Sequence, residues 1–364
     1  MANGPEGLED VVAAHTVLSD VDGAAGRLLV RGEPVEALCG RVGFETMVRR
    51  LWDGFFEHLP DDLQQPLGEA RSRVFTHTAA LDDELARREP MEALRALTAR
   101  LADGEDLETA LNLLAAPAVF TAAIARRRRS EAPIAPDPRL GHSADALRML
   151  AGAPASQERA WALDGYLVTV MDHGLNASTF AARVAASTRA GLTSAVVAGL
   201  SALKGPLHGG APGPVIDMLD DIGEAANARP WLEAALQRGD RLMGFGHRIY
   251  RVRDPRADAL KAVVKRLNER ADAWTGRLAL AEAVEAAALA VLRERKPGRS
   301  LDVNVEFYTA LLLEALAFPR DAFTCVFAMG RTAGWIAHAR EQIATGRIVR
   351  PQSVYVGPRP SLAA

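Results

Sequence analysis

The sequence predicts an all-α protein, with a small hairpin possible near the N-terminus. Only 5% of the 364 residues are aromatic, whereas alanine and leucine, which lose little entropy in a helix, are abundant. Apolar residues recur at helical spacing in several long stretches, and signals for β-strands are sparse. These observations together favour a large helical protein with a sizeable core.

The clearest apolar stretches are expected to form buried helices. Residues 180–203 carry apolar side chains almost all round the helical wheel, which is typical of a helix inside a large α protein. Residues 279–295 and 332–345 also have helical periodicity. Gly346 stands where a C-terminal capping glycine belongs, so we expect the last of these helices to end there.

Two segments are expected to be irregular or extended. In residues 19–35, glycine and aspartate separate short apolar pieces that could form a hairpin. Residues 126–142 contain four consecutive arginines followed by a proline-rich stretch, which predicts a helix end and then a loop. Such an arginine run is more typical of a solvated helix terminus than of a nucleic-acid site.

Composition makes several function classes improbable. The 43 Lys and Arg against 46 Asp and Glu give a net charge of −3, which supplies no global field for nucleic acid. The apolar stretch from Leu278 is interrupted by Glu282 and Glu285, so we expect no membrane span. The start, MANGPEGLED, is polar and acidic and lacks a basic region followed by an apolar stretch, so we expect no secretory signal. Cys39 and Cys325 are too few for a disulfide scaffold and suit a reducing, cytoplasmic location.

Three histidines, His173, His208 and His247, lie beside glycines, which allow a backbone to approach a ligand closely. For each of them alone, a structural and a functional role are about equally plausible. Their wide separation and the lack of a cysteine or carboxylate cluster predict no metal site, and no P-loop or dinucleotide-binding motif is present. The other histidines are expected to be structural: His15, His58, His77, His142 and His338.

Three arginines next to glycine or proline form a second group: Arg256, Arg331 and Arg350. A guanidinium can bind a carboxylate in bidentate fashion. Each arginine alone is more typical of a surface residue, but three of them combined with imidazoles suit a small dicarboxylate or tricarboxylate ligand.

Four sequence blocks carry a resemblance. They are KGPLHGGAPGPV from Lys204, GFGHRIYRVRDPRA from Gly244, NVEFYTALL from Asn304 and AMGRTAGWIAHAREQ from Ala328, with RPQSVYVG following. In order and spacing they resemble the signature blocks of the citrate synthase family, and the similarity covers nearly the whole chain.

The resemblance implies an all-α homodimer with a two-domain, citrate synthase-like fold. Residues 1–216 and 326–364 would form the large domain, and residues 217–325 a small domain inserted into it. The active site would lie in the cleft between the domains, which closes when the oxoacid binds and excludes water.

The resemblance also implies catalytic roles. His208 would donate a hydrogen bond to the thioester carbonyl of acetyl-CoA and stabilise the forming enol. His247 would polarise the ketone of oxaloacetate, and Glu306 would be the base. These residue types fit the chemistry, because a weak base removes an α-proton only if the developing oxyanion is stabilised.

Binding roles follow by the same comparison. His173, Arg256 and Arg331 would hold the oxoacid, and Arg350 would reach into the partner subunit's site. Arg251, Lys296 and Arg299 are candidate contacts for CoA, although a solvated basic loop explains them equally well. Acyl-CoA is a substrate here, and no cofactor is expected.

Glu306 is the main departure from the family pattern, because most relatives have aspartate there. Its side chain reaches about 1.3 Å farther, and a misplacement of about 1 Å can reduce the rate on the order of 10²-fold unless the backbone adjusts. We favour an adjusted, active site. Asp302 is a less favoured alternative base, and Gly174, where many relatives have glutamate, is expected to have only a local effect.

The predicted reaction is the condensation of acetyl-CoA with oxaloacetate and water to citrate and CoA. A 2-methylcitrate synthase using propionyl-CoA is an alternative, since one methylene in a pocket is worth only about 1–3 kcal/mol. A catalytically weak, ligand-binding paralogue is a third hypothesis, which Glu306 motivates.

Overall fold

The computed structural model describes residues 11–209, 212–247, 249–250, 252–270, 275–296 and 301–358. Helices dominate these residues, as the sequence predicts. The helices are α1 (Val35–Leu38), α2 (Phe44–Trp52), α3 (Gln64–Phe75), α4 (Asp83–Arg87), α5 (Pro90–Thr98), α6 (Leu107–Arg128), α7 (His142–Ala151), α8 (Gln157–Val170), α9 (Ala177–Ser187), α10 (Leu192–Leu203), α11 (Pro212–Ile222), α12 (Ala228–Gln237), α13 (Pro255–Arg270), α14 (Thr275–Arg295), α15 (Val305–Ala315) and α16 (Phe323–Thr345).

The predicted hairpin is present. Strands β1 (Ser19–Asp22) and β2 (Arg27–Val30) pair antiparallel with Ser19 opposite Val30, and the short β3 (Glu33–Pro34) continues the sheet. The Asp22 carboxylate accepts hydrogen bonds from the backbone N–H groups of Ala24 and Ala25, at 3.1 and 2.9 Å. This side chain nucleates the turn, and Gly26 closes it with a φ of +64°.

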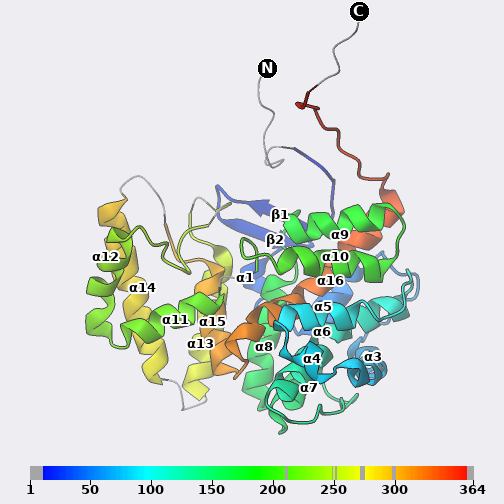
Figure 1. Ribbon diagram of the computed structural model, residues 1–364, viewed down its shortest axis with the longest axis horizontal. Helices are drawn as coiled ribbons and strands as arrows, with labels where there is room; N and C mark the ends of the chain where they lie inside the picture. The colour runs from blue at the N-terminus through cyan, green and yellow to red at the C-terminus, as the bar shows by residue number, and fades with distance from the viewer. Residues whose placement is uncertain are drawn as a thin grey trace, which may run out of the picture.

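The central helix is α16, which packs against α6, α8, α9 and α10 (Figure 1). Its middle is buried, because Gly330 and Gly334 bring it against α8 and the segment that follows. A Cβ at Gly330 would lie 2.7 Å from the Leu167 carbonyl oxygen, and one at Gly334 would collide with the Met171 carbonyl. This close approach places Arg331, between the two glycines, next to the chain that leads to His173.

The expectation of one helix over residues 180–203 is wrong. The chain forms α9 and α10, separated by a turn in which Arg189 and Gly191 have φ of +63° and +95°. The Asp103 carboxylate accepts hydrogen bonds from the N–H of Thr193, at 2.8 Å, and of the next residue, at 3.1 Å. A side chain distant in sequence thus caps the N-terminus of α10, which hydrophobic periodicity alone does not reveal.

The other predicted elements are confirmed with small differences. Helix α14 covers 279–295 and α16 covers 332–345, and Gly346 follows the last helical residue. Gly346 is extended, at φ −95°, rather than left-handed. Its lack of a Cβ matters because a Cβ there would collide with Gln342.

The arginine run ends α6, and a loop leads to α7, as predicted. Arg127 and Arg128 pair with Asp83 and Asp321, and Arg128 also donates to the Arg88 carbonyl. The run therefore ties the helix end to neighbouring segments. Helix α6, rather than the stretch from Leu278, is long and apolar enough to span a bilayer, but most of it is buried inside the protein as a core helix.

Helices α11 to α14 lie together on the side opposite α3 and α5 (Figure 1). Within this group α12 packs on α14, and both α11 and α13 pack on α15. The domain limits at 217 and 325 stay a prediction. The segment that carries His247 meets the N-terminus of α15, where the Asn304 side chain donates to the Gly246 carbonyl at 2.7 Å.

Candidate active site

His247 and Arg256 present two hydrogen-bond donors toward the same point. The Nδ1 atom of His247 lies 3.0 Å from the backbone nitrogen of Ile249 and 3.2 Å from that of Tyr250. Both are donors, so Nδ1 accepts and the neutral ring carries its proton on Nε2. Nε2 lies 3.2 Å from Nη2 of Arg256, which is also a donor. An oxygen that lies beside the line joining these two nitrogens, about 2.9 Å from each, would accept from both.

Asp254 fixes this arrangement. Its carboxylate binds the Arg256 guanidinium through Nε, at 3.0 Å, and Nη2, at 2.8 Å. The same carboxylate accepts a hydrogen bond from the backbone N–H of Val305 at 3.1 Å. Asn304 caps α15 and donates to the Gly246 carbonyl at 2.7 Å. The start of α15 is thereby tied to the segments of His247 and Arg256.

Glu306 stands in the first turn of α15, where a helix N-terminus favours a carboxylate. Burial nevertheless raises the pKa of Glu306 to about 7; the charge of Arg256 opposes this rise, and that of Asp254 adds to it. A carboxyl with this pKa is poised to exchange a proton near neutral pH.

His173 lies at the centre of the site, and its ring centroid is 5.9 Å from that of His247. Its Nε2 is 3.0 Å from the Tyr250 hydroxyl. Burial and the charges of Arg256 and Arg331 lower the pKa of His173 well below the ordinary value, so the ring is neutral. A neutral imidazole can orient a polar ligand without adding charge.

Arg331 is buried in α16. Its Nε donates to the Val170 carbonyl at 2.6 Å, and the guanidinium carbon lies 4.8 Å from the Phe327 ring centroid. Burial lowers the pKa of Arg331 to about 10, and the negative charge of Asp172 opposes this decrease. Arg331 therefore remains a cation at neutral pH, with Asp172 as its nearby countercharge.

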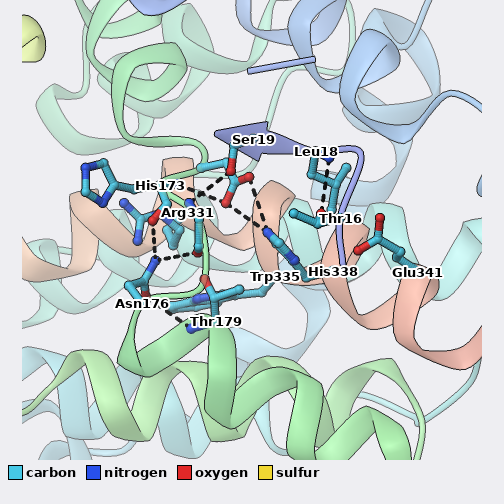
Figure 2. Close-up of polar contacts among 12 residues, drawn as sticks. Thr16, Leu18, Ser19, His173, Asn176, Thr179, Arg331, Trp335, His338 and Glu341 are labelled. Atoms are coloured by element: carbon cyan, nitrogen blue, oxygen red, sulfur yellow. Dashed lines mark hydrogen bonds and ion pairs between the residues drawn. The ribbon is translucent and has the colours of Figure 1, made fainter. Parts of the chain in front are cut away.

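His208 is half-buried and hydrogen-bonds through Nε2 to the Ser178 hydroxyl at 2.8 Å. The Ser178 oxygen also accepts from Trp335 Nε1 at 3.1 Å and lies 2.8 Å from the Asn176 side-chain oxygen. Burial and the charge of Arg331 lower the pKa of His208 to about 4. Figure 2 shows Asn176 and Trp335 near His173 and Arg331 in the same polar cluster.

Comparison with known proteins identifies the family. A family model described as "Citrate synthase, C-terminal domain" matches residues 7–352. The chain belongs to the citrate synthase family. It is therefore a member of an enzyme family that transfers an acyl group in a condensation, and the resemblance seen in its sequence blocks is confirmed.

Relatives within the citrate synthase family bear two names. A citrate synthase from Haloferax volcanii is 38% identical and matches 96% of this chain and 95% of its own length. A 2-methylcitrate synthase from Mycobacterium tuberculosis is 34% identical and matches 97% of this chain and 90% of its own length.

Solved structures agree on the fold. The citrate synthase from Thermotoga maritima superposes with a TM-score of 0.83 at 31% identity, over 99% of this chain and 97% of the other. A ternary complex of citrate synthase from Thermoplasma acidophilum with carboxymethyl coenzyme A and oxaloacetate gives 0.81 at 27% identity, over 98% and 97%. The predicted helical citrate synthase fold is confirmed.

The structure brings together six of the residues that the citrate synthase resemblance implicates: His173, His208, His247, Arg256, Glu306 and Arg331. Arg350 does not join them, because it is exposed in a C-terminal segment that runs away from the helices (Figure 1). Lys296 is exposed just beyond α14. Arg251 and Arg299 lie outside the described residues.

Sequence reasoning missed four residues that shape this candidate site: Asp172, Ser178, Tyr250 and Asp254. Asp254 had a usable signal, since it stands two residues before Arg256 and can bind that guanidinium locally. The role of Ser178 depends on the packing of α9 against α16. His338, expected to be structural, is buried with its Nε2 3.2 Å from the Asp172 carboxylate.

Proposed function

We propose that this protein is a citrate synthase, which condenses acetyl-CoA with oxaloacetate and water to give citrate and CoA. The observation that carries the proposal is the meeting of His247 Nε2–H and Arg256 Nη2–H at 3.2 Å. Two donors at this distance form no hydrogen bond with each other, and an oxygen of an oxoacid would accept from both. The Thermoplasma acidophilum relative binds oxaloacetate and a CoA analogue, which agrees with this ligand class.

Charge balance supports a contribution from a second subunit. Asp254 pairs with Arg256, and the charge of Asp172 acts on Arg331, so both arginines are already partly neutralised before substrate binds. A dianionic oxoacid would therefore benefit from a further cation. We assign this role to Arg350 of the other protomer of a homodimer, since Arg350 lies on an extended, exposed segment.

At the acyl end, Glu306 takes the proton from the α-carbon of the thioester. His208 donates Nδ1–H to the thioester oxygen and stabilises the enol. In the unliganded site the Ser178 hydroxyl donates to Asn176 Oδ1 at 2.8 Å, so it accepts from His208 Nε2–H. Donation from His208 Nδ1 therefore requires the hydroxyl hydrogen to turn from Asn176 to His208 Nε2 when the acyl-CoA binds, and Ser178 keeps the ring oriented in either tautomer.

At the oxoacid end, His247 donates Nε2–H to the ketone while the enol carbon attacks it, and it protonates the new alkoxide. His173, Arg256 and Arg331 hold the carboxylates. Water then hydrolyses the citryl thioester and releases CoA. The proposal calls for no metal or cofactor, because these side chains account for the proton transfers of the condensation step.

The same groups would serve propionyl-CoA, and a relative named 2-methylcitrate synthase matches nearly as well. The test is CoA release from purified protein with oxaloacetate and either acetyl-CoA or propionyl-CoA. A higher kcat/KM with acetyl-CoA supports citrate synthase, and the reverse supports 2-methylcitrate synthase. No release with either substrate would refute both and favour a ligand-binding paralogue.

Two finer assignments belong to the same proposal. Arg251, Lys296 and Arg299 are proposed CoA contacts, because a CoA phosphate would suit basic residues of this kind. A cytoplasmic location is proposed because Cys39 and Cys325 are free, buried thiols.

A further inference from the structure

The hairpin β1–β2 contacts both segments that carry the oxoacid-site histidines. At its base, the Ser19 hydroxyl accepts a hydrogen bond from the backbone N–H of Gly174 at 2.9 Å and donates one to the Asp172 carboxylate. These two residues flank His173. Figure 2 shows Ser19 beside His173 and Arg331. The base of the hairpin therefore holds the His173 segment from both sides.

The other end of the hairpin packs on the segment that follows His247. A Cβ at Gly23 would lie 2.8 Å from Ile249 Cγ2 and closer still to the Ile249 carbonyl oxygen. A Cβ at Gly26 would lie 2.6 Å from Val252 Cγ2. Any side chain larger than hydrogen at these two positions would push the hairpin and the His247 segment apart.

The base of the hairpin is anchored in the helical core. The Val17 N–H donates to Glu341 at 2.9 Å, and Glu341 accepts from Arg183 at 2.6 Å. Arg183 also donates to His338 Nδ1 at 2.9 Å, so the His338 proton is on Nε2 and faces Asp172 at 3.2 Å. This buried chain closes a loop from the hairpin through α16 and α9 back to Asp172.

We propose that the β1–β2 hairpin is a brace that sets the spacing between His173 and His247, with Ser19 and Gly23 as positioning residues. The inference rests on the proposed function, because it assigns the brace to the oxoacid subsite. His173 and His247 belong to different segments of the chain, and the hairpin touches both. Misplacement of a binding group by about 1 Å can reduce the rate on the order of 10²-fold. A structural element that fixes the spacing between His173 and His247 would therefore protect the activity.

The test compares glycine substitutions in the hairpin region. Gly23→Ala and Gly26→Ala place a methyl group against the His247 segment. Gly32→Ala is the matched control for Gly26→Ala, since both glycines have positive φ, at +84° and +64°, but a Cβ at Gly32 meets nothing within 4 Å. Oxaloacetate affinity is measured by calorimetry, with the melting temperature of each variant as the readout of stability.

We expect Gly23→Ala and Gly26→Ala to raise the Kd for oxaloacetate about tenfold, while Gly32→Ala keeps the wild-type Kd. If all three variants bind alike, whether tightly or weakly, the brace is refuted. Wild-type protein that neither binds oxaloacetate nor releases CoA would instead refute the proposed function. The two failures are therefore distinguishable.

A second pair of variants keeps the proposal testable if the Gly23→Ala and Gly26→Ala proteins do not fold. Ser19→Ala removes both hydrogen bonds to the His173 segment, and Ser19→Thr retains the hydroxyl on a residue that favours strands. We expect Ser19→Ala to raise the Kd for oxaloacetate and Ser19→Thr to restore it. An unchanged Kd in Ser19→Ala would overturn the role of Ser19.

Discussion

The raised pKa of Glu306 leads to a specific pH dependence. Burial raises this pKa to about 7, whereas an ordinary glutamate titrates near 4.5. The base acts only when ionised, so activity should fall as the pH drops through 7. At pH 5 about 1% of such a group is ionised, compared with about three quarters of an ordinary glutamate. We therefore expect kcat/KM to decrease on the order of 10²-fold from pH 8.5 to pH 5.

The assay is CoA release at saturating oxaloacetate across pH 5 to 9. Titration of His208 and His247 does not contribute to the acidic limb between pH 5 and pH 9. Burial lowers the pKa of each to about 4, so both rings stay neutral above pH 5. An acidic limb with an apparent pKa below about 5.5 would refute the reasoning from burial.

Substitutions identify the group that titrates. Glu306→Gln should reduce kcat by about 10²- to 10⁴-fold and remove the acidic limb. Glu306→Asp withdraws the carboxylate by about one methylene and should reduce kcat on the order of 10²-fold with the limb retained. Asp302→Asn tests the alternative base and should leave the limb in place. Near-normal turnover in Glu306→Gln would show that another group is the base.

Three further predictions follow from other parts of the structure. Ser178→Ala should reduce kcat about 10- to 100-fold with KM for oxaloacetate unchanged, because only the orientation of His208 is lost; equal effects on both constants would contradict this. Arg350→Gln and His208→Ala should each be inactive, yet co-refolding equal amounts should restore about a quarter of wild-type activity if Arg350 serves the partner's site. No restoration would place Arg350 in its own chain's site. His142 is buried, stacked on Phe44, and its ring nitrogens have no hydrogen-bond partner among the described residues. Burial holds the folded pKa of His142 well below 6.5, so its contribution to stability is present above pH 6.5 and is lost as the pH falls toward the folded value. His142→Leu should therefore reduce the loss of stability between pH 6.5 and 5, by at most about 1.6 kcal/mol, in urea unfolding; an unchanged pH dependence would argue against a buried, neutral ring.

The boundary between α9 and α10 cannot be predicted from local sequence patterns. Hydrophobic periodicity runs through residues 180–203 without interruption, because both helices are buried. The break is decided by the Asp103 carboxylate, which caps α10 from a distant segment. A capping group more than 80 residues away leaves no local signal.

The sequence by itself determined the helical class, the hairpin and the family, because composition, periodicity and ordered motifs are local properties of the chain. It also picked out six residues that converge in the site. Only the tertiary structure decided the groups that set their protonation and spacing: Asp254 beside Arg256, Ser178 beside His208, and the hairpin between His173 and His247. These are contacts between segments or burial effects, and the dielectric and geometry that control a pKa or a tautomer exist only after the helices have packed.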